Sequence, residues 1–282
     1  MAVSAADPAA APAPERVRIR CAQLAPVIGE TDGNLAAIER EFAAAAVDGV
    51  DLLVLPELAT CGYSMTPAEA RAAALRADDA VIRRWSEMLA GSGTTAVIGF
   101  CEDGGSALYN SAAVIVHGAE PVVYRKLHLW DAEKLIFTPG DARPPIVRTP
   151  AGALGVIVCY DLEFPEVPRS LALEGADLIA VPTNWPMRSR PRGERPQEVI
   201  HAMAAAQASA IAIACCDRSG DERGTSWTEG TTVVGPDGWP LGVAGPDGRL
   251  DVEVELPAGR RRIGERNDLF EDRRPGLYGP LG

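Results

Sequence analysis

Three side chains that could do chemistry stand directly after apolar runs of this sequence. Glu57 follows DLLVLP, Lys126 follows PVVYR, and Cys159 follows ALGVIV. Such runs are typical of buried strands, and the strand ends of α/β proteins meet at one rim of a sheet, where ligands bind. A thiol, a carboxylate and an ammonium that meet there could serve as a nucleophile, its base and an electrostatic stabiliser. The spacing therefore predicts an acyl-transfer site, although each residue alone has an ordinary structural explanation.

The histidine and cysteine content narrows this chemistry. The chain has three histidines, His117, His128 and His201, and no two of them have metal-ligand spacing. We therefore expect no metal and no cofactor. Its six cysteines form no CxxC pair. In a chain of this size that pattern favours reduced thiols and a cytoplasmic location.

Composition excludes other classes of function. The 282 residues carry 27 Lys and Arg against 39 Asp and Glu, a net charge of −12, which argues against a nucleic-acid partner. No apolar run approaches the length of about 18 residues that spans a bilayer, so we expect no membrane partner. Residues 1–15 are rich in Ala and Pro and lack the pattern of a secretory signal. We interpret them as a flexible tail before one domain over residues 16–259, with residues 260–282 as a C-terminal tail that contributes to oligomer contacts.

The elements that must position these residues alternate between strands and helices. We expect strands at 17–22, 51–55, 94–101, 108–117, 121–125, 146–149, 153–158, 177–181 and 211–216. Helices are expected at 34–46, 67–91, 165–175 and 194–208. Two further hairpins are predicted around residues 236–238 and 246–248. Units of βαβ mixed with hairpins predict an α/β fold whose sheets contain both parallel and antiparallel pairs.

Three ordered motifs resemble the carbon–nitrogen hydrolases of the nitrilase superfamily. They are LVLPELATCGY with Glu57, YRKLHLWDAEKLIFTPGD with Lys126 and Glu133, and GVIVCYDLEFPEVPRSLALEGADLIAVPTNW with Cys159. The similarity runs from about Val17 to the C-terminus. It implies a four-layer αββα sandwich and a catalytic triad of Glu57, Lys126 and Cys159. It also implies a homodimer or a higher homo-oligomer, and an acyl transfer that needs no histidine.

The same resemblance assigns roles around the triad. Glu133 is expected near Lys126, where it would help position the lysine or the substrate; the alternative is a surface residue paired with Lys134. Lys126 and the backbone N–H of Tyr160 would hold the oxyanion. Lys126 is also expected to lower the pKa of the Cys159 thiol by its charge.

Further residues could shape the substrate pocket. Tyr63 follows Glu57 in a turn, and Asn184 and Trp185 follow the predicted strand at 177–181. Tyr63 and Trp185 could equally be packed on the core. Glu163, four residues after Cys159, would add an acidic group, and the segment 227–230 could reach the pocket rim. His128 is interpreted as a packing residue and not as a base.

The segment after the cysteine favours one reaction within this superfamily. CYDLEFPE looks most like amidases that act on small primary carboxamides and release ammonia. An N-carbamoyl amidohydrolase comes second and a nitrilase third. Two other uses of the scaffold stay open: acyl transfer to an acceptor other than water, and a non-catalytic binding role, against which the intact triad argues.

Overall fold

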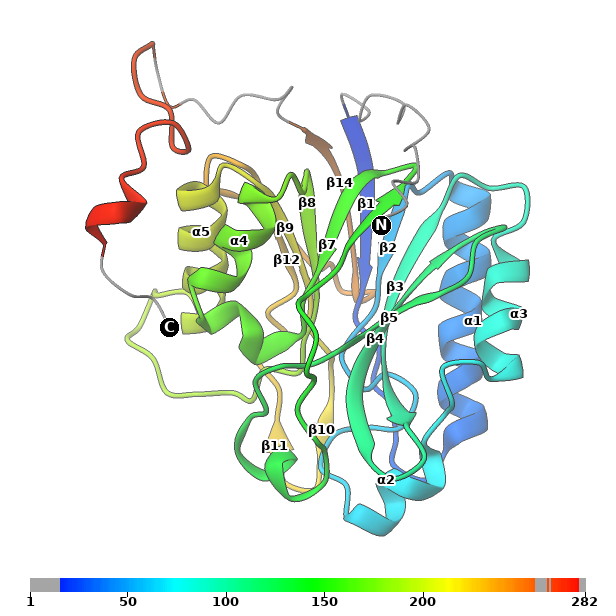
Figure 1. Cartoon of the computed structure of the whole chain (residues 1–282). Coiled ribbons are helices and arrows are strands. Elements are labelled where there is room, and N and C mark those ends of the chain that lie inside the picture. Colours follow the sequence, from blue (N-terminus) through cyan, green and yellow to red (C-terminus); the bar gives the residue numbers. More distant parts are fainter. Residues whose placement is uncertain (1–15, 257–262, 264, 279–282) are drawn as a thin grey trace, which may run out of the picture.

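A computed structural model describes residues 16–256, 263 and 265–278. The predicted tail at residues 1–15 lies outside the described residues. So do residues 257–262, 264 and 279–282, which take in part of the predicted C-terminal tail. Figure 1 shows the arrangement of the described elements.

Two six-stranded sheets form the centre of the molecule, and both are mixed. The first sheet has the spatial order β14 (Arg249–Glu255), β1 (Arg16–Ala22), β2 (Leu52–Val54), β3 (Thr95–Asp103), β4 (Leu108–Val116) and β5 (Val122–Arg125). Its three strands β1, β2 and β3 are parallel, and antiparallel strands flank them. The parallel strands put the residues that follow β1, β2 and β3 at one edge.

The second sheet repeats this pattern. Its order is β13 (Pro240–Val243), β12 (Thr232–Val234), β9 (Ala212–Cys216), β8 (Leu178–Pro182), β7 (Gly152–Val156) and β6 (Ile146–Thr149). Strands β7, β8 and β9 are parallel. The residues that follow these three strands therefore also lie at one edge.

Helices cover the outer face of each sheet (Figure 1). On one side lie α1 (Thr31–Asp48) and α3 (Ala80–Met88), and on the other lie α4 (Glu166–Leu173) and α5 (Gln197–Ser209). Phe42 of α1 packs on Trp85 of α3 with ring centroids 5.7 Å apart, and both side chains are buried. The predicted αββα sandwich with mixed sheets is confirmed.

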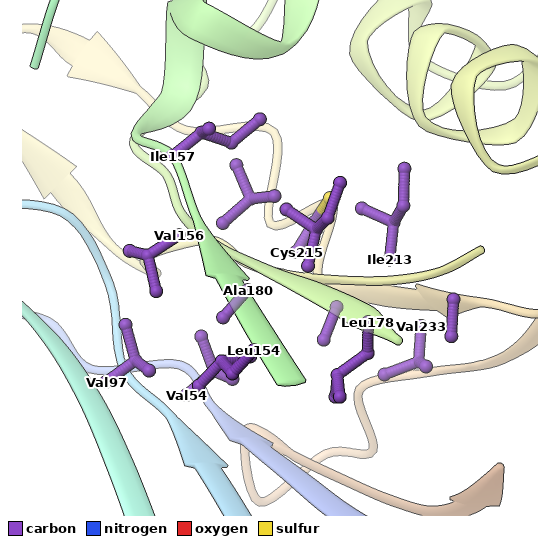
Figure 2. Close-up of a cluster of buried hydrophobic side chains, with 14 of the residues drawn as sticks. Val54, Val97, Leu154, Val156, Ile157, Leu178, Ala180, Ile213, Cys215 and Val233 are labelled. Atoms are coloured by element: carbon purple, nitrogen blue, oxygen red, sulfur yellow. The ribbon is translucent and has the colours of Figure 1, made fainter. Parts of the chain in front are cut away.

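Side chains of the two inner faces interdigitate to form the central core. Val54 and Val97 from the first sheet approach Leu154 and Val156 from the second (Figure 2). Because side chains alternate along a strand, Cys215 faces the helices, whereas the Cys216 thiol points at the first sheet and donates to the carbonyl of Ala22 at 3.3 Å. The side chains of these adjacent cysteines therefore point to opposite faces of β9.

The prediction of one helix over residues 67–91 is wrong. The segment forms α2 (Pro67–Ala73) and α3, separated by an extended stretch in which Leu75 pairs with Glu102 near the C-terminal end of β3. The N–H of Leu75 donates to Cys101 O, and the N–H of Asp103 donates to Leu75 O, both at 2.9 Å. This tertiary pairing overrides helix propensity, and the Asp79 carboxylate then caps a new helix through the N–H of Val81.

The second predicted hairpin is also wrong. A tight turn does occur at residues 245–248, but β13 before it pairs with β12, while β14 after it pairs with β1 of the other sheet. The turn therefore joins the two sheets. A short ladder of β10 (Asp221–Glu222) and β11 (Thr225–Ser226), which the sequence pattern does not predict, lies beyond the strand-end edge.

Candidate active site

The predicted strand-end residues come together where the edges of the two sheets meet. Glu57 follows β2, Lys126 follows β5, and Cys159 opens a short 3₁₀ helix after β7. Two hydrogen bonds tie the edges together: the N–H of Glu57 donates to Thr183 O at 3.4 Å, and Asn184 Nδ2 donates to Glu57 O at 2.9 Å. The site therefore spans both sheets and needs the complete sandwich.

A continuous chain of charged hydrogen bonds forms the centre of this site. Lys126 Nζ lies 2.6 Å from Glu57 Oε1 and 2.8 Å from Glu133 Oε1, and all three side chains are buried. The Tyr63 hydroxyl donates to Glu133 Oε1 at 2.5 Å, and Asn110 Nδ2 donates to Glu57 Oε1 at 2.7 Å. Glu133 thus lies against Lys126 and is not a surface partner of Lys134.

Burial and charge set the protonation of this chain. Burial, reinforced by the charge of Glu133, raises the pKa of Glu57 to about 7, against the opposing effect of Lys126. Burial tends to lower the pKa of Lys126, but Glu133 and Glu57 outweigh it, and that pKa lies well above its usual value. Glu57 can therefore exchange a proton near neutral pH, while Lys126 stays charged.

The backbone of Cys159 is strained and its side chain is buried. Its φ is +46°, a left-handed conformation that costs a residue with a Cβ on the order of 1–3 kcal/mol. The thiol lies 3.9 Å from Asn184 O as a hydrogen-bond donor. Burial and the charge of Glu57 raise the thiol pKa well above its usual value, although Lys126 pulls it down. Lys126 thus lowers the thiol pKa as expected, but burial and Glu57 outweigh it, so the resting group is a neutral thiol that needs a base.

Tyr160 takes the position next to this thiol. Among the described residues, none accepts a hydrogen bond from its backbone N–H. Its ring contacts the rings of Trp130 and Phe164 edge-on, at centroid distances of 4.8 and 5.1 Å. The aromatic contacts therefore hold the Tyr160 ring, while its backbone N–H follows Cys159 directly in the chain.

Asp161 connects the loop of Lys126 to the turn of Cys159, and the sequence analysis did not single it out. Its buried carboxylate accepts from the N–H of Val158 at 3.0 Å and from the Tyr124 hydroxyl at 2.8 Å. It also accepts from the N–H of His128 at 3.0 Å, and His128 Nδ1 lies 2.7 Å away. His128 lies beyond the end of β5 and stacks on Phe164, which matches its interpretation as a packing residue.

Asp217 is a second residue that the sequence analysis did not single out. It follows β9, as Glu57 follows β2, so the same strand-end signal could have found it. Its carboxylate accepts from the backbone N–H groups of Trp185, Arg218 and Gly230 at 2.8–2.9 Å. Burial raises its pKa to about 7 against these three donors. Asp217 thereby fixes Trp185, which is buried next to Asn184.

A cavity of about 370 Å³ opens beside Glu133 and Tyr63. Trp227 forms another wall of this cavity. It is held there by a β-bridge to Pro186 and by an edge-on contact with the Tyr63 ring, with ring centroids 5.4 Å apart. The predicted approach of the segment 227–230 to the pocket thus agrees with the structure. Glu163 does not line this cavity: it is half-buried and faces a separate cavity between the 3₁₀ helix, α4 and α5.

The described part of the chain has neither a metal-binding cluster nor a membrane-spanning helix. No group of three or more His, Cys, Asp or Glu side chains there could hold a metal ion. No helix within the same residues is long and apolar enough to cross a membrane.

Comparison with known proteins gives one family and several relatives. The family model for carbon–nitrogen hydrolases matches residues 18–258. A nitrilase of Pyrococcus abyssi is 32% identical over 268 residues, which cover 93% of this chain and 99% of the relative. An (R)-stereoselective amidase of Pseudomonas sp. is also 32% identical and covers 93% of both chains.

The solved structures of an amidase from Nesterenkonia sp. AN1 are similar to the whole sandwich. One of them has a TM-score of 0.77 at 29% identity and covers 93% of this chain and 95% of the amidase. In another, the acetamide moiety of fluoroacetamide is attached to the active site cysteine of that amidase. A further one holds butyramide.

Proposed function

The chain belongs to the carbon–nitrogen hydrolase family, and from this we propose that it hydrolyses small carboxamides to a carboxylic acid and ammonia through a thioester on Cys159. The reaction class, cleavage of a non-peptide C–N bond, follows from the family. The assignment of residues to steps rests on the geometry described above. One observation carries it furthest: Glu57 has one oxygen held by Lys126 and Asn110, and its Oε2 is buried with no partner among the described residues.

The unpartnered oxygen of Glu57 is the proposed acceptor of the thiol proton. The sulfur of Cys159 forms a bond to the carbonyl carbon of the amide while its proton moves to Glu57. A carboxylate with a pKa of about 7 is suited to this transfer, because it is partly ionised at neutral pH and still basic. The high pKa of the thiol explains why the attack needs this base.

Collapse of the tetrahedral intermediate then breaks the C–N bond. Glu57 gives its proton to the leaving nitrogen, and ammonia departs to leave the thioester. Water next attacks the thioester carbon and gives a proton to Glu57. The C–S bond breaks, the acid leaves, and the proton returns to the sulfur, so that the starting state is restored.

Two groups are proposed to stabilise the oxyanion in both halves of the reaction. An ammonium has three protons, and Lys126 uses two of them on Glu57 and Glu133, which leaves one for the developing oxyanion. The N–H of Tyr160 supplies the second donor. Loss of one such donor typically costs about 100- to 1000-fold in rate. Glu133 and Tyr63 hold the lysine in place from the other side.

A substrate panel tests this function. Ammonia release is measured from acetamide, hexanamide, an N-carbamoyl amine and hexanenitrile, with the wild-type chain and with Cys159→Ala. We expect the carboxamides to react fastest and the variant to lose about 1000-fold or more in rate. Faster ammonia release from the carbamoyl compound, accompanied by carbon dioxide, would identify that compound as the better substrate instead. Ammonia release that is equal in both proteins would overturn the proposal.

A further inference from the structure

The walls of the cavity beside Glu133 are mainly apolar and aromatic. The apolar residues that line it are Tyr63, Met65, Trp130, Ala132, Ile136, Phe137, Pro186 and Trp227. A volume of about 370 Å³ lies at the small end of the range of about 300–1,000 Å³ for ligand pockets. The cavity therefore has the size and the apolar lining of a site for a small substrate group.

The aromatic wall is held from behind by a buried ion pair. Arg218 lies 4.7 Å from the Trp227 ring centroid and donates to Glu222 at 2.9 Å. Glu222 in turn accepts from the backbone N–H groups of Tyr63 and Ser64, at 3.0 and 2.6 Å. One ion pair thus fixes both faces of the Tyr63–Trp227 corner, so the shape of the cavity is set before a substrate enters.

The carboxyl side chains of Asp131 and Glu133 line the cavity, and no Lys, Arg or His side chain lines it among the described residues. The guanidinium groups next to lining residues already face carboxylates. Arg223 donates to Ser64 O at 2.9 Å and pairs with Glu69 at 2.6 Å. Arg218 lies behind Trp227 and pairs with Glu222 at 2.9 Å, and Arg188 stacks on Trp130 and lies 3.7 Å from Glu198. Lys126, which lies beside Glu133, is already paired with two carboxylates, so a substrate carboxylate that entered the cavity would lose water and meet no unpaired cation there.

From these observations, and resting on the proposed function, we infer that the cavity is the acyl pocket and selects neutral carboxamides. The preferred acyl group is apolar and about the size of a hexanoyl or phenylacetyl group. Amides whose acyl group ends in a carboxylate, and N-carbamoyl amino acids with their free acid, are rejected. The pocket thereby separates simple carboxamides from the acidic substrates that the reaction chemistry alone would accept.

Three amides of matched length test the inference: hexanamide, 6-aminohexanamide and the monoamide of adipic acid. Acetamide serves as a short reference. We expect kcat/KM for hexanamide to exceed that for acetamide by about tenfold or more, because added methylene groups fill an apolar pocket. We expect the adipic monoamide to fall at least about 100-fold below hexanamide, because its carboxylate is desolvated without a partner. The cationic amide should also fall below hexanamide, because its ammonium would lose water against the apolar walls while Glu133 is already paired with Lys126.

A substitution in the wall provides a sharper test. Trp227→Ala removes the indole that separates Arg218 from the cavity, so the guanidinium becomes reachable by a substrate carboxylate. We expect the preference for hexanamide over the adipic monoamide to drop at least about tenfold. Trp239→Ala is the matched control, because Trp239 is 65% exposed and lies outside this cavity; its preference should equal that of the wild type.

The outcomes separate this inference from the function on which it rests. If acetamide is hydrolysed but a charged amide is used as well as hexanamide, the acyl-pocket inference fails and the amidase function stands. If Trp227→Ala and Trp239→Ala keep the same preference, the assignment of the wall fails. If no amide reacts faster than with Cys159→Ala, the proposed function itself fails.

Discussion

At the scale of single residues, the two carboxylate oxygens of Glu57 have different surroundings. Oε1 is fixed by Lys126 and Asn110, and this pair orients the carboxylate. Oε2 has no partner among the described residues, although it is buried. A buried acceptor without a hydrogen bond lowers the stability of the fold. A role as the acceptor of the thiol proton would explain why Oε2 is kept in this state. The same carboxylate can then serve each proton transfer without a histidine.

The pH dependence of kcat/KM should report the titration of Glu57. Its carboxylate must be ionised to accept the thiol proton, so activity should fall as pH decreases below about 7, the pKa that burial gives this group. Glu57→Gln should lose about 100- to 10,000-fold in kcat/KM. Activity is measured from about pH 4 to 9 at several concentrations of one amide, so that kcat/KM is obtained at each pH. An acid limb that lies near the ordinary glutamate pKa of about 4.3 would contradict this assignment.

Glu133→Gln provides the matching control for that profile. The charge of Glu133 raises the pKa of Glu57, so its removal should move the acid limb to lower pH. A residue that merely supported the fold would lower activity without moving the limb.

Sequence spacing identified the charged residues well and the neutral ones poorly. Glu57, Lys126 and Cys159 were predicted from their places after strands, because parallel strand ends converge. Asn110 gave no such signal, since it lies inside β4 and reaches Glu57 only through the pairing of β4 with its neighbours. The raised pKa of the Cys159 thiol could not be predicted either, because it depends on burial and on the distance to Glu57.

At the scale of elements, β3 supports the loop that carries Glu57. Gly99 of β3 donates to Pro56 O at 3.1 Å and accepts from the N–H of Ala59 at 2.9 Å. A Cβ atom on Gly99 would lie 2.5 Å from Glu57 Cα and 2.6 Å from Pro56 O. The glycine therefore allows a close backbone approach, and that approach sets the position of the carboxylate.

Gly99→Ala should displace Glu57 and reduce kcat about 100-fold, because a misplacement of about 1 Å at a catalytic group has effects of that size. The variant should also lose roughly 1–3 kcal/mol of stability from overpacking. Gly93→Ala is the control, since a Cβ there meets open space, and it should leave both quantities unchanged. Kinetics and urea unfolding check the pair; equal kcat for the two variants would refute the role of Gly99.

Elements were predicted where local pattern decides and missed where tertiary pairing decides. The strands of the two parallel cores were predicted within a few residues because they are continuous apolar runs. The break between α2 and α3 depends on Leu75 pairing with β3, and the partner of β14 lies more than two hundred residues away in the sequence. Neither contact can be predicted from the local sequence pattern.

At the scale of the whole molecule, the fold buries ionisable groups at the meeting edge of its two sheets. Glu57 and Asp217 follow strands of different sheets, and burial raises the pKa of each to about 7. Between about pH 4 and pH 7 the folded protein therefore binds more protons than the unfolded chain, in which these groups are ionised. Their contribution to stability is fully present below the unfolded pKa values and is lost as pH rises through about 7.

The homodimer or higher homo-oligomer expected from the sequence stays a prediction.

Asp217→Asn should make stability less dependent on pH. The shift from 3.8 to about 7 corresponds to on the order of 4 kcal/mol, lost by the wild type as pH rises across this interval. The asparagine cannot ionise, so the unfolding free energy of the variant should fall less steeply as pH rises. Its value at low pH should be lower than that of the wild type, because an amide N–H of the asparagine faces a backbone N–H. Urea unfolding at about pH 5, 6, 7 and 8 measures both slopes. Parallel slopes in the two proteins would disprove the buried titration of Asp217.

The central claim is that the acyl group of an amide is carried by the sulfur of Cys159. It is tested most directly by mixing the wild-type chain with hexanamide, quenching with acid during turnover, and mapping the peptides by mass spectrometry. The account predicts a hexanoyl group on the peptide that contains Cys159, released by hydroxylamine and absent from Cys159→Ala. An acyl group on another residue such as Cys61, or none at all while ammonia is still released, would contradict it.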